Sequence, residues 1–174
     1  MKLSELMQGY SPSADFEGWV TNDDFVLAID LNPNASSATK DEEYSVVQMG
    51  IEGLDAQMNP ITVEKTYIRA GKSTLRTGTQ RSFKMTGDRY IGDEVQDYIM
   101  SHAIKYGTGN KVVTHYLYFN VLNGQGERGQ VTIIVNSDGG GNAGESAAID
   151  VEFKKVGSLP KEYTFTGTVH QATA

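Results

Sequence analysis

The sequence contains no cysteine, and this absence removes several classes of protein at once. Without cysteine there is no disulfide framework, no CxxC zinc site, no iron–sulfur cluster and no cysteine nucleophile. Long apolar runs are missing too: residues 1–8 lack the apolar core of a signal peptide, and no later stretch is apolar enough to cross a bilayer. The composition therefore predicts a protein made and folded in a cytoplasm, with no membrane partner.

Proline is also scarce, with four residues against 19 glycines in a chain of 174, which indicates many turns between short strands. This length fits one domain with its own core, and hydrophobic residues at 39% are typical of a globular protein. We expect a single domain over 1–174 with three appendages: an N-terminal arm at 1–15, a long loop at 70–80 and a C-terminal arm at 166–174.

Basic residues are in the minority, at 15 against 22 acidic ones, and the net charge is −7. This balance argues against a duplex DNA binder that neutralises phosphates. The charge is unevenly distributed: residues 1–60 carry a net charge of −9 and residues 61–90 a net charge of +5. Two interpretations stay open. The basic segment is a solvated strand pair beside an acidic surface, or the two charges serve head-to-tail contact between copies of the chain.

Most of the sequence has the residue pattern of β-strands. Residues 24–31 alternate, with Phe25, Leu27 and Ile29 on one face and Val26 and Ala28 on the other. A turn-like stretch at 53–60 follows the strand candidate 44–49. The Val, Ile, Tyr and Phe content of 112–122 and 130–136 predicts that these two segments form a hairpin. The further strand candidates are 44–49, 61–68, 81–90, 112–122, 130–136, 147–154 and 162–169.

One segment, residues 93–106, has helical spacing instead. Asp93 is placed to cap a helix, with Gln96 in the capping-box position and Gly107 as the residue after its end. The apolar residues at helical spacing are Val95, Ile99, Ala103 and Tyr106. The predicted fold class is therefore mainly β, an antiparallel β-sandwich with one flanking α-helix.

No motif that carries catalysis or holds a cofactor survives inspection. Residues 124–129 match GxGxxG, but the apolar run after them predicts a strand where a dinucleotide site needs a helix, so we interpret them as a hairpin turn. The three histidines lie far apart, and neither HExxH nor GxSxG occurs. We expect no catalytic residues, no metal and no cofactor.

Several segments, taken in order, carry a family resemblance across roughly residues 44–165. They include the run GIEGLDAQMNP at 50–60, with 65–69 after it, and TGTQRSFKMTGDRY at 77–90, with the predicted helix following. The likeness continues through 116–123 and 134–139. The chain resembles the major tail tube protein of long flexible-tailed, siphovirus-type bacteriophages of Gram-positive bacteria. The resemblance rests on whole segments, not on a catalytic signature.

This resemblance implies a fold and a function. Subunits of that family form hexameric rings whose strands join into one β-barrel, and the rings stack around a tape-measure protein into a tube for DNA passage. The implied partners are the chain itself, tape-measure, tail-terminator and distal tail proteins, and transiently DNA; the implied location is the virion tail. Ring closure also has a physical rationale, because it removes the open sheet edges that otherwise promote aggregation.

Two sets of residues are candidates for work in such a tube. The loop at 70–80 holds Lys72 and Arg76, which we expect to reach an adjacent subunit and face its acidic N-terminal third. The acidic candidates there are Asp23, Asp24, Asp41, Glu42 and Glu43. Acidic residues of the barrel strands are expected to line the lumen, because carboxylates repel phosphates; the candidates are Glu43, Asp150 and Glu152, with outer-surface carboxylates as the competing interpretation.

A second function class stays open beside the tube. A monomeric β-sandwich binding module for a carbohydrate or protein ligand would use its aromatic residues as a stacking platform. Trp19, Tyr116 and Tyr118 are the candidates. Aromatic residues in alternating strands more often belong to a core or an interface, because they bury large areas. A third class, a small enzyme, has no supporting motif.

Overall fold

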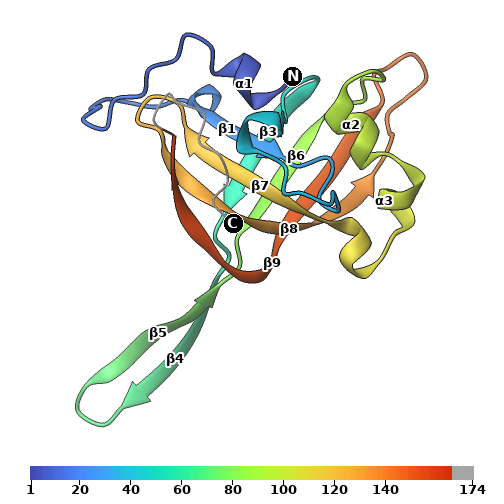
Figure 1. Ribbon diagram of the computed structural model, residues 1–174. Coiled ribbons are helices and arrows are strands. Elements are labelled where there is room, and N and C mark those ends of the chain that lie inside the picture. Colours follow the sequence, from blue (N-terminus) through green and yellow to red (C-terminus); the bar gives the residue numbers. More distant parts are fainter. Residues whose placement is uncertain (166–174) are drawn as a thin grey trace.

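The computed structural model describes residues 1–165, and in this part of the chain one antiparallel sheet of seven strands curls around a core (Figure 1). The strands lie in the order β2-β1-β7-β8-β9-β6-β3. Their bounds are β1 Phe25–Ile29, β2 Ser45–Val46, β3 Ile51–Gln57, β6 Ser82–Asp88, β7 Val113–Asn120, β8 Gln125–Ser137 and β9 Ala148–Thr164. A separate pair, β4 Pro60–Tyr67 and β5 Gly71–Thr79, forms a hairpin that projects from the sheet. The predicted mainly β class, antiparallel and flanked by helix, is confirmed.

Strand β1 shows why the sheet has a core on each side. Leu27 and Ile29 point to one face and Val26 and Ala28 to the other, and all four are buried. Alternating residues of a strand lie on opposite faces, so a strand that is apolar at every position is covered on both. The predicted division of 24–31 into two faces is confirmed.

The larger core lies between the inner face of the curled sheet and two short helices, α2 Glu94–Ile99 and α3 His102–Tyr106. The β6, β8 and β9 strands contribute one face each. The members from the sheet and helices are Leu27, Ile29, Val47, Phe83, Met85, Val95, Ile99, Met100, Ile104, Val112, Tyr116, Val131, Ile133, Ile149, Val151 and Phe153. Helices α2 and α3 thus cover the inner side of the sheet.

The predicted helix at 93–106 is two helices, and the break changes which residues face the core. Asp93 caps α2 as expected, accepting the amide hydrogen of Gln96 over 3.0 Å. At Ser101 the backbone is extended, and its hydroxyl donates to the Tyr98 carbonyl, a local bond that competes with the helix. The break shifts the phase, so the prediction that Ala103 and Tyr106 face the sheet is wrong: both are exposed, and Ile104 is buried instead.

The smaller core covers the outer face of β1 and β7 and is closed by the chain's first residues. Leu3, in helix α1 Leu3–Leu6, and Met7 are buried there, and the amide of Leu3 donates to the Tyr44 carbonyl. Residues 1–7 therefore pack against the sheet, and only the stretch after them is an extended, exposed loop. The expected C-terminal arm, 166–174, lies outside the described residues.

Two segments predicted as irregular are strands. The stretch 53–60, expected to be a turn, lies mostly in β3, and the loop expected at 70–80 is strand β5, paired with β4 along its length. Gly53 and the Asn59–Pro60 pair suggested a turn in the first segment, and the Gly, Thr and Ser content suggested a loop in the second. Cross-strand pairing satisfies their backbone groups instead, and threonine favours a pleated surface.

The glycine-rich segment 124–129 is also mostly strand, since the turn of the β7–β8 hairpin lies at 121–124 and β8 begins at Gln125. The prediction of a hairpin is confirmed: Gly124 serves the turn, and Gly126 serves close approach between the strands. A Cβ on Gly126 would lie 2.0 Å from the Tyr118 carbonyl oxygen. Gly124 has a φ of +74° and the same crowding against Phe165.

We expect Ile99→Ala to lower the free energy of unfolding by about 2–5 kcal/mol, because Ile99 is 0% exposed and the cavity left behind cannot fully collapse. Tyr106→Ala is the matched control on the same helical segment. Tyr106 is 72% exposed, so its replacement should change stability by no more than about 0.5 kcal/mol. Urea denaturation of both variants measures the two values. A loss of stability for Ile99→Ala as small as that for Tyr106→Ala would mean that the helices are peripheral.

Candidate assembly surfaces

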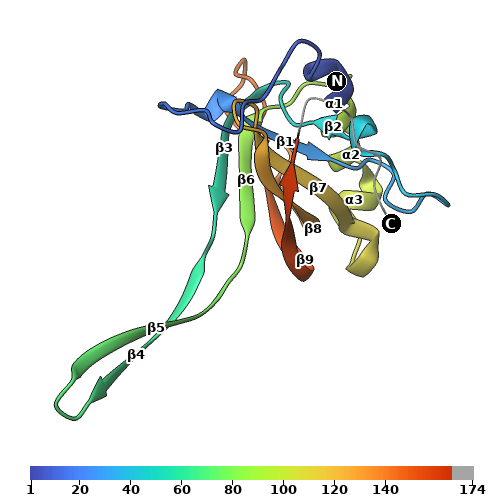
Figure 2. The same ribbon diagram turned by 60° about the vertical axis from the view of Figure 1, so that its left-hand side comes forward.

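Strands β3 and β6 leave the sheet together and continue, past a short interruption, into the β4–β5 hairpin, which we call the arm (residues 58–80) (Figure 2). Eight residue pairs hold β4 to β5, from Pro60 opposite Thr79 to Tyr67 opposite Gly71. An eight-residue strand spans roughly 27 Å, so the arm reaches well beyond the body of the molecule. Every residue of β4 is exposed.

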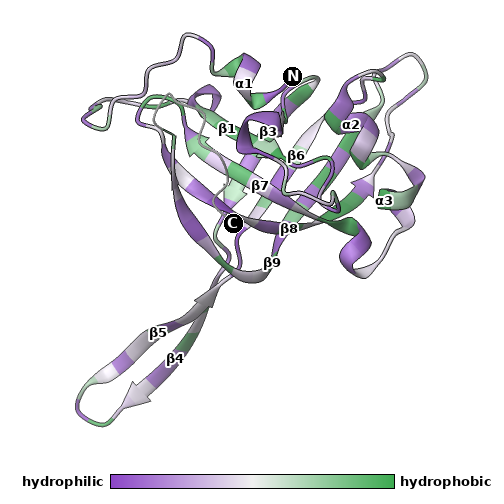
Figure 3. Cartoon of the chain, viewed as in Figure 1, coloured by the Kyte–Doolittle hydropathy of each residue, from purple (hydrophilic) through white to green (hydrophobic). Residues whose placement is uncertain are grey.

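The arm is amphipathic although nothing in the described chain covers it. Every second position of β4 carries Ile61, Val63, Lys65 and Tyr67, and Leu75 lies directly opposite Val63, so the apolar side chains share a face that one lysine interrupts. Figure 3 shows hydrophobic and hydrophilic residues interleaved along the arm, away from the sheet that holds the core. An isolated two-stranded hairpin is marginally stable in water. An apolar face on such a hairpin is therefore a candidate surface for contact with another chain.

The root of the arm is held by a buried charge network. Arg81 is 11% exposed at its side chain, and its Nε lies 2.8 Å from Glu127 Oε1, which also accepts the Tyr116 hydroxyl at 2.8 Å. The guanidinium lies over the rings of Phe83 and Tyr118. Burial, and then the hydrogen bond to Glu127, raises the pKa of Tyr116 far above its ordinary value, which keeps the hydroxyl protonated and donating.

A second set of bonds at the root joins the two strands where the arm leaves the sheet. Asn59, whose φ of +44° marks a left-handed turn, donates from Nδ2 to the Gln80 carbonyl over 3.0 Å and to the Ser82 hydroxyl over 2.7 Å. The amide of Gln80 returns a bond to the Met58 carbonyl. These contacts tie the direction of the arm to strand β6.

The two cations predicted to face a neighbour lie on the polar face of the arm. Lys72 is bound by Glu64 of the same hairpin at 2.7 Å, so the expected free cation is already paired. Arg76 is exposed and has no ion-pair partner within residues 1–165. Both charges sit on an ordered strand, not on a mobile loop.

The acidic residues predicted to receive them are not brought together. The prediction that Asp41 faces a neighbouring subunit as an exposed carboxylate is wrong. Asp41 is buried beside the smaller core and accepts two hydrogen bonds of 3.2 Å from the Arg128 guanidinium. Glu42 Oε1 lies 3.9 Å from Lys40 Nζ. Asp24 accepts a hydrogen bond from the Thr21 amide as part of a helix cap. The remaining candidates, Asp23 and Glu43, lie on separate elements.

Of the three lumen candidates, two lie together. Asp150 and Glu152 occupy the face of β9 opposite the core, since Ile149 and Val151 point inward. Each carboxylate has a lysine nearby: Lys84 at 3.6 Å from Asp150, and Lys154 at 3.9 Å from Glu152. Glu43 lies apart, in the 3-10 helix η2 Asp41–Glu43. The outer face of β6 and β9 is therefore a polar row of closely paired charges.

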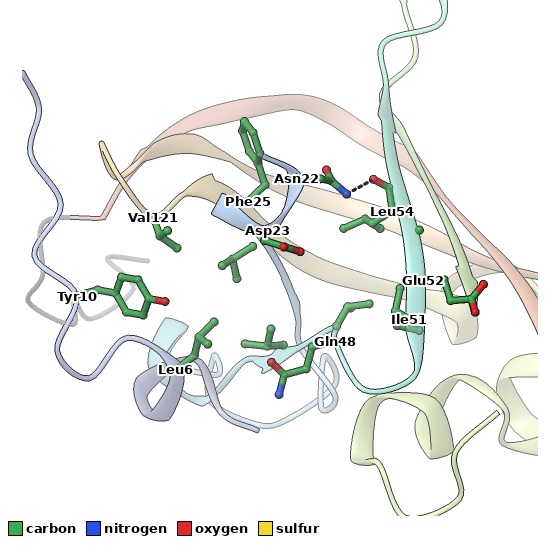
Figure 4. Close-up of a pocket in the computed structure, with 14 residues that line it drawn as sticks. Leu6, Tyr10, Asn22, Asp23, Phe25, Gln48, Ile51, Glu52, Leu54 and Val121 are labelled. Carbon is green, nitrogen blue, oxygen red and sulfur yellow. Dashed lines mark hydrogen bonds between the residues drawn. The ribbon is translucent and has the colours of Figure 1, made fainter. Parts of the chain in front are cut away.

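A cleft of about 250 Å³ lies between β1 and β2 on one side and β3, the last strand of the sheet, on the other (Figure 4). The curl of the sheet brings these strands near one another, and within residues 1–165 the bond that crosses the cleft runs from Asn22 Nδ2 to the Leu54 carbonyl, at 3.4 Å. Its lining is mixed: apolar side chains such as Leu6, Ile51 and Leu54 lie beside polar residues, which include Asn22, Asp23 and Gln48. The outer edge of β3 therefore stays open.

The structure does not assemble the stacking platform expected of a binding module. Tyr116 is buried, and Tyr118 packs between the rings of Phe25 and Phe83, whereas Trp19 is 100% exposed in the loop before β1. Within residues 1–165 no group of three or more His, Asp or Glu side chains is placed to hold a metal ion. None of the helices in that range is long and apolar enough to cross a membrane.

Comparison with known proteins gives matches of fold among solved structures. No protein-family model and no curated protein matches the chain. Among solved structures, the fold is similar to that of a chain in the tail of an empty gene transfer agent particle with C6 symmetry, at 15% identity and a TM-score of 0.55 over 84% of this chain and 100% of that one. The fold is also similar to that of a chain of the native gene transfer agent virion, at 14% identity and a TM-score of 0.52 over 84% of this chain and 99% of that one.

A third similar structure is a chain of the anti-feeding prophage cap, which terminates a tube, at 9% identity and a TM-score of 0.50 over 86% of this chain and 94% of that one. The chain has the fold of phage-tail-like tube proteins. At these identities the likeness establishes the fold alone, and it agrees with the expectation that the sequence segments raised.

Sequence reasoning missed the arm and the cleft for different reasons. The alternation of Ile61, Val63 and Tyr67 was visible and predicted a strand, but its partner was taken for a loop because of its glycines and threonines. The cleft had no local signal, because residues from 6 to 121 line it and only the curl of the sheet brings them together.

We expect Arg81→Met to lower the free energy of unfolding by about 1.5–3 kcal/mol, since it removes a charged hydrogen bond and leaves Glu127 partly buried without its cation. Arg76→Met is the matched control on the exposed arm and should change stability by no more than about 0.5 kcal/mol. Thermal and urea unfolding compare the two variants. A loss at Arg81 no larger than at Arg76 would show that the root network does not hold the arm.

Proposed function

We propose that this chain is a non-catalytic structural subunit that assembles into hexameric rings, which stack into the tail tube of a long flexible-tailed bacteriophage of Gram-positive bacteria. The observation that carries the proposal is the arm: an ordered, amphipathic hairpin with an apolar face that its own chain leaves uncovered. Fold similarity to a tail with C6 symmetry and the resemblance of the sequence segments support the same conclusion.

Ring formation uses the sheet edges in this proposal. Strand β3 ends the sheet on one side with an open edge, and the opposite edge, β2, is only two residues long. Open edges pair with other chains unless they are covered, and a closed ring covers all of them. Heterologous contacts of this kind generate closed rings within a layer and open-ended stacks between layers.

The proposed partners follow from the tube. They are other copies of the chain, a tape-measure protein inside, tail-terminator and distal tail proteins at the ends, and DNA in transit; the location is the virion tail, after synthesis in the host cytoplasm. The similarity to a tube-terminating cap supports a stack that must be closed by a related fold.

The polar row on β6 and β9 is the proposed lumen wall. Its lysines are close to Asp150 and Glu152, so the surface offers no unpaired cations to hold phosphates. Glu43 contributes to the lumen only if η2 faces it in the ring.

We expect the double change Asp150→Lys with Glu152→Lys to leave tubes intact but to slow DNA release from particles, most strongly at low salt, because a cationic wall binds phosphates. A matched control, Asp138→Lys with Glu145→Lys, adds the same charge on the exposed loop before β9. Time courses of DNA release compare the two. Equal release from both variants would place the row outside the lumen.

Electron microscopy of concentrated purified protein tests the assembly itself. We expect rings or tubes, fewer as salt rises, because exposed charges are screened beyond roughly 8–10 Å at physiological ionic strength. Hydrogen exchange gives a second readout: the amides of β4 and β5 should exchange quickly in the monomer and become protected in the assembly. Monomers that persist at every salt and protein concentration, even with other tail components added, would contradict the proposal.

Arg76→Glu is a sharper test of charge than a double change with Lys72, because Lys72 already binds Glu64. We expect Arg76→Glu to leave the monomer folded and to weaken tube growth. Lys111→Glu, in the exposed segment before β7, is the control of equal charge change. If Arg76→Glu grows tubes like the control at low salt, the polar face of the arm does not contact a neighbour.

A further inference from the structure

The loop before β1 presents the chain's single tryptophan to solvent. Trp19 is 100% exposed, and Phe16 and Val20 beside it are exposed as well. Two exposed carboxylates, Asp15 and Glu17, lie among these side chains and have no ion-pair partner within residues 1–165. Tryptophan is enriched among the residues that contribute most to protein interfaces, because it buries a large area. A tryptophan left wholly in water therefore indicates a binding surface.

The loop has a defined shape that keeps Trp19 in solvent. The amide of Ser13 donates to the Leu122 carbonyl over 2.9 Å, and the amide of Phe16 donates to the Ser13 carbonyl over 3.0 Å. The Phe16 ring lies close to the backbone of Gly18, where a Cβ would stand 3.2 Å from Phe16 Cζ. The loop thus uses Phe16 for its own packing and leaves Trp19 for a partner.

A hollow of about 240 Å³ lies where β9 bulges away from β8. Between two successive pairs of the ladder, four residues of β9 (157–160) lie opposite the single residue Gly129 of β8. Gly157 has a φ of +73° there, which glycine adopts without steric cost. Bulges re-aim side chains and are common near functional positions. The three extra residues open the sheet and form the rim of the hollow.

The hollow has the opposite chemical character to the loop. Its lining includes Arg128, Lys161 and His115 and contains no carboxylate. Asp41 already binds Arg128, whereas Lys161 is exposed and has no ion-pair partner in the part of the chain that the structure describes. Leu159, on the bulge, is 70% exposed. The hollow therefore offers a free cation beside an apolar side chain.

Size and charge both favour the loop as its occupant. A cavity of about 150 Å³ takes up a benzene ring, so a hollow of about 240 Å³ has room for an indole ring. Two other hollows have carboxylates in their lining, which repel an acidic loop: Asp23 and Glu52 in the β1–β3 cleft, and Asp93 and Glu94 beside α2. Opposite charges across an interface favour the correct partner over such alternatives.

Within one chain the loop and the hollow are held apart. The base of the loop is fixed to Leu122 at the turn of the β7–β8 hairpin, and the hollow begins roughly 17 Å along β8, at about Gln130. The amide of Lys155 donates to the Arg81 carbonyl, which places the bulge beside the root of the arm. Both views show the loop near α1 and the bend of β9 at the end from which the arm projects (Figures 1 and 2). A contact between loop and hollow therefore joins two copies and is heterologous.

We propose that the loop at 13–20 of one copy docks into the hollow at the β9 bulge of a second copy, with Trp19 against Leu159 and Glu17 against Lys161. The inference rests on the proposed tube function and names an interface that uses no residue of the arm. The indole ring also attracts the cations of the lining, and the Ser158 hydroxyl there is an acceptor for the indole N–H.

The fluorescence of Trp19 reports the contact directly, because the chain has no other tryptophan. In the monomer the emission should be that of an indole in water, freely quenched by acrylamide. On assembly the emission should shift to shorter wavelength, and quenching should fall by more than half. Trp19→Ala should raise the protein concentration needed for assembly by roughly 10–100-fold, as expected for an interface hot spot. Tyr106→Ala, at an exposed aromatic residue outside both surfaces, should not change it.

A charge exchange tests which surface receives the tryptophan. Lys161→Glu should raise the concentration needed for assembly and weaken the emission shift, whereas Lys111→Glu, at another exposed lysine, should do neither. Adding Glu17→Lys to Lys161→Glu should restore both readouts. Glu145→Lys, in the exposed loop before β9, is the matched control and should restore neither.

Cysteine crosslinking gives a third readout that retains Trp19, because the natural chain has no cysteine. Val20→Cys with Ser158→Cys places one thiol on the loop and one in the hollow. After assembly and mild oxidation it should give a ladder of covalent multimers on a non-reducing gel. Val20→Cys with Ile91→Cys, an exposed position outside the hollow, should give no ladder.

The outcomes separate this contact from the proposed function. Tubes whose Trp19 emission stays that of the monomer, a crosslink that forms within one chain, or no rescue by Glu17→Lys would overturn the docking contact and leave the tube function standing. Wild-type protein that forms neither rings nor tubes would overturn the function and this contact with it.

Discussion

The structure depends on a strand pair that passes from the core to the solvent. β3 and β6 are anchored in the sheet, where Phe83 and Met85 are completely buried, and the same two strands continue as the exposed arm. Because an isolated hairpin is marginally stable, the ordered conformation of the arm depends on this anchorage and on the Arg81–Glu127 pair at its root. The apolar face that it presents is thus held in place but left without a partner.

In the proposed tube, that constraint suits one small domain to building a long object. The uncovered apolar face of the arm repeats from copy to copy, so each proposed subunit presents the same surface to a neighbour. The separation of charge, acidic before residue 60 and basic in the arm, adds a preference for opposite ends to meet. Each exposed ion pair contributes only about 0–1 kcal/mol, so in the proposed ring the repetition of a pair matters more than any single pair.

Comparison of particular elements shows where sequence reasoning succeeded and where it stopped. The alternation in β1 predicted both of its faces, and the Asp93 cap predicted the start of α2. The end of that helix was predicted less well, because a local bond from Ser101 broke it and moved Ile104 into the core. Strand β5 was mistaken for a loop because its glycines and threonines carry no signal of the partner that pairs with them.

The sequence by itself determined the mainly β class, the absence of thiol chemistry, the opposed charges and the segment order that resembles a tail tube protein. These are properties of composition and local period, which do not depend on how distant residues meet. Only the tertiary structure decided that Asp41 is buried against Arg128, that Lys72 is paired and that a cleft opens between β1 and β3. The burial of Asp41 and the cleft arise from the curl of the sheet, which brings together residues as far apart in the sequence as Asp41 and Arg128, and no local pattern encodes that contact. The pairing of Lys72 with Glu64 arises from the register of β4 against β5, which the sequence did not reveal because β5 resembled a loop.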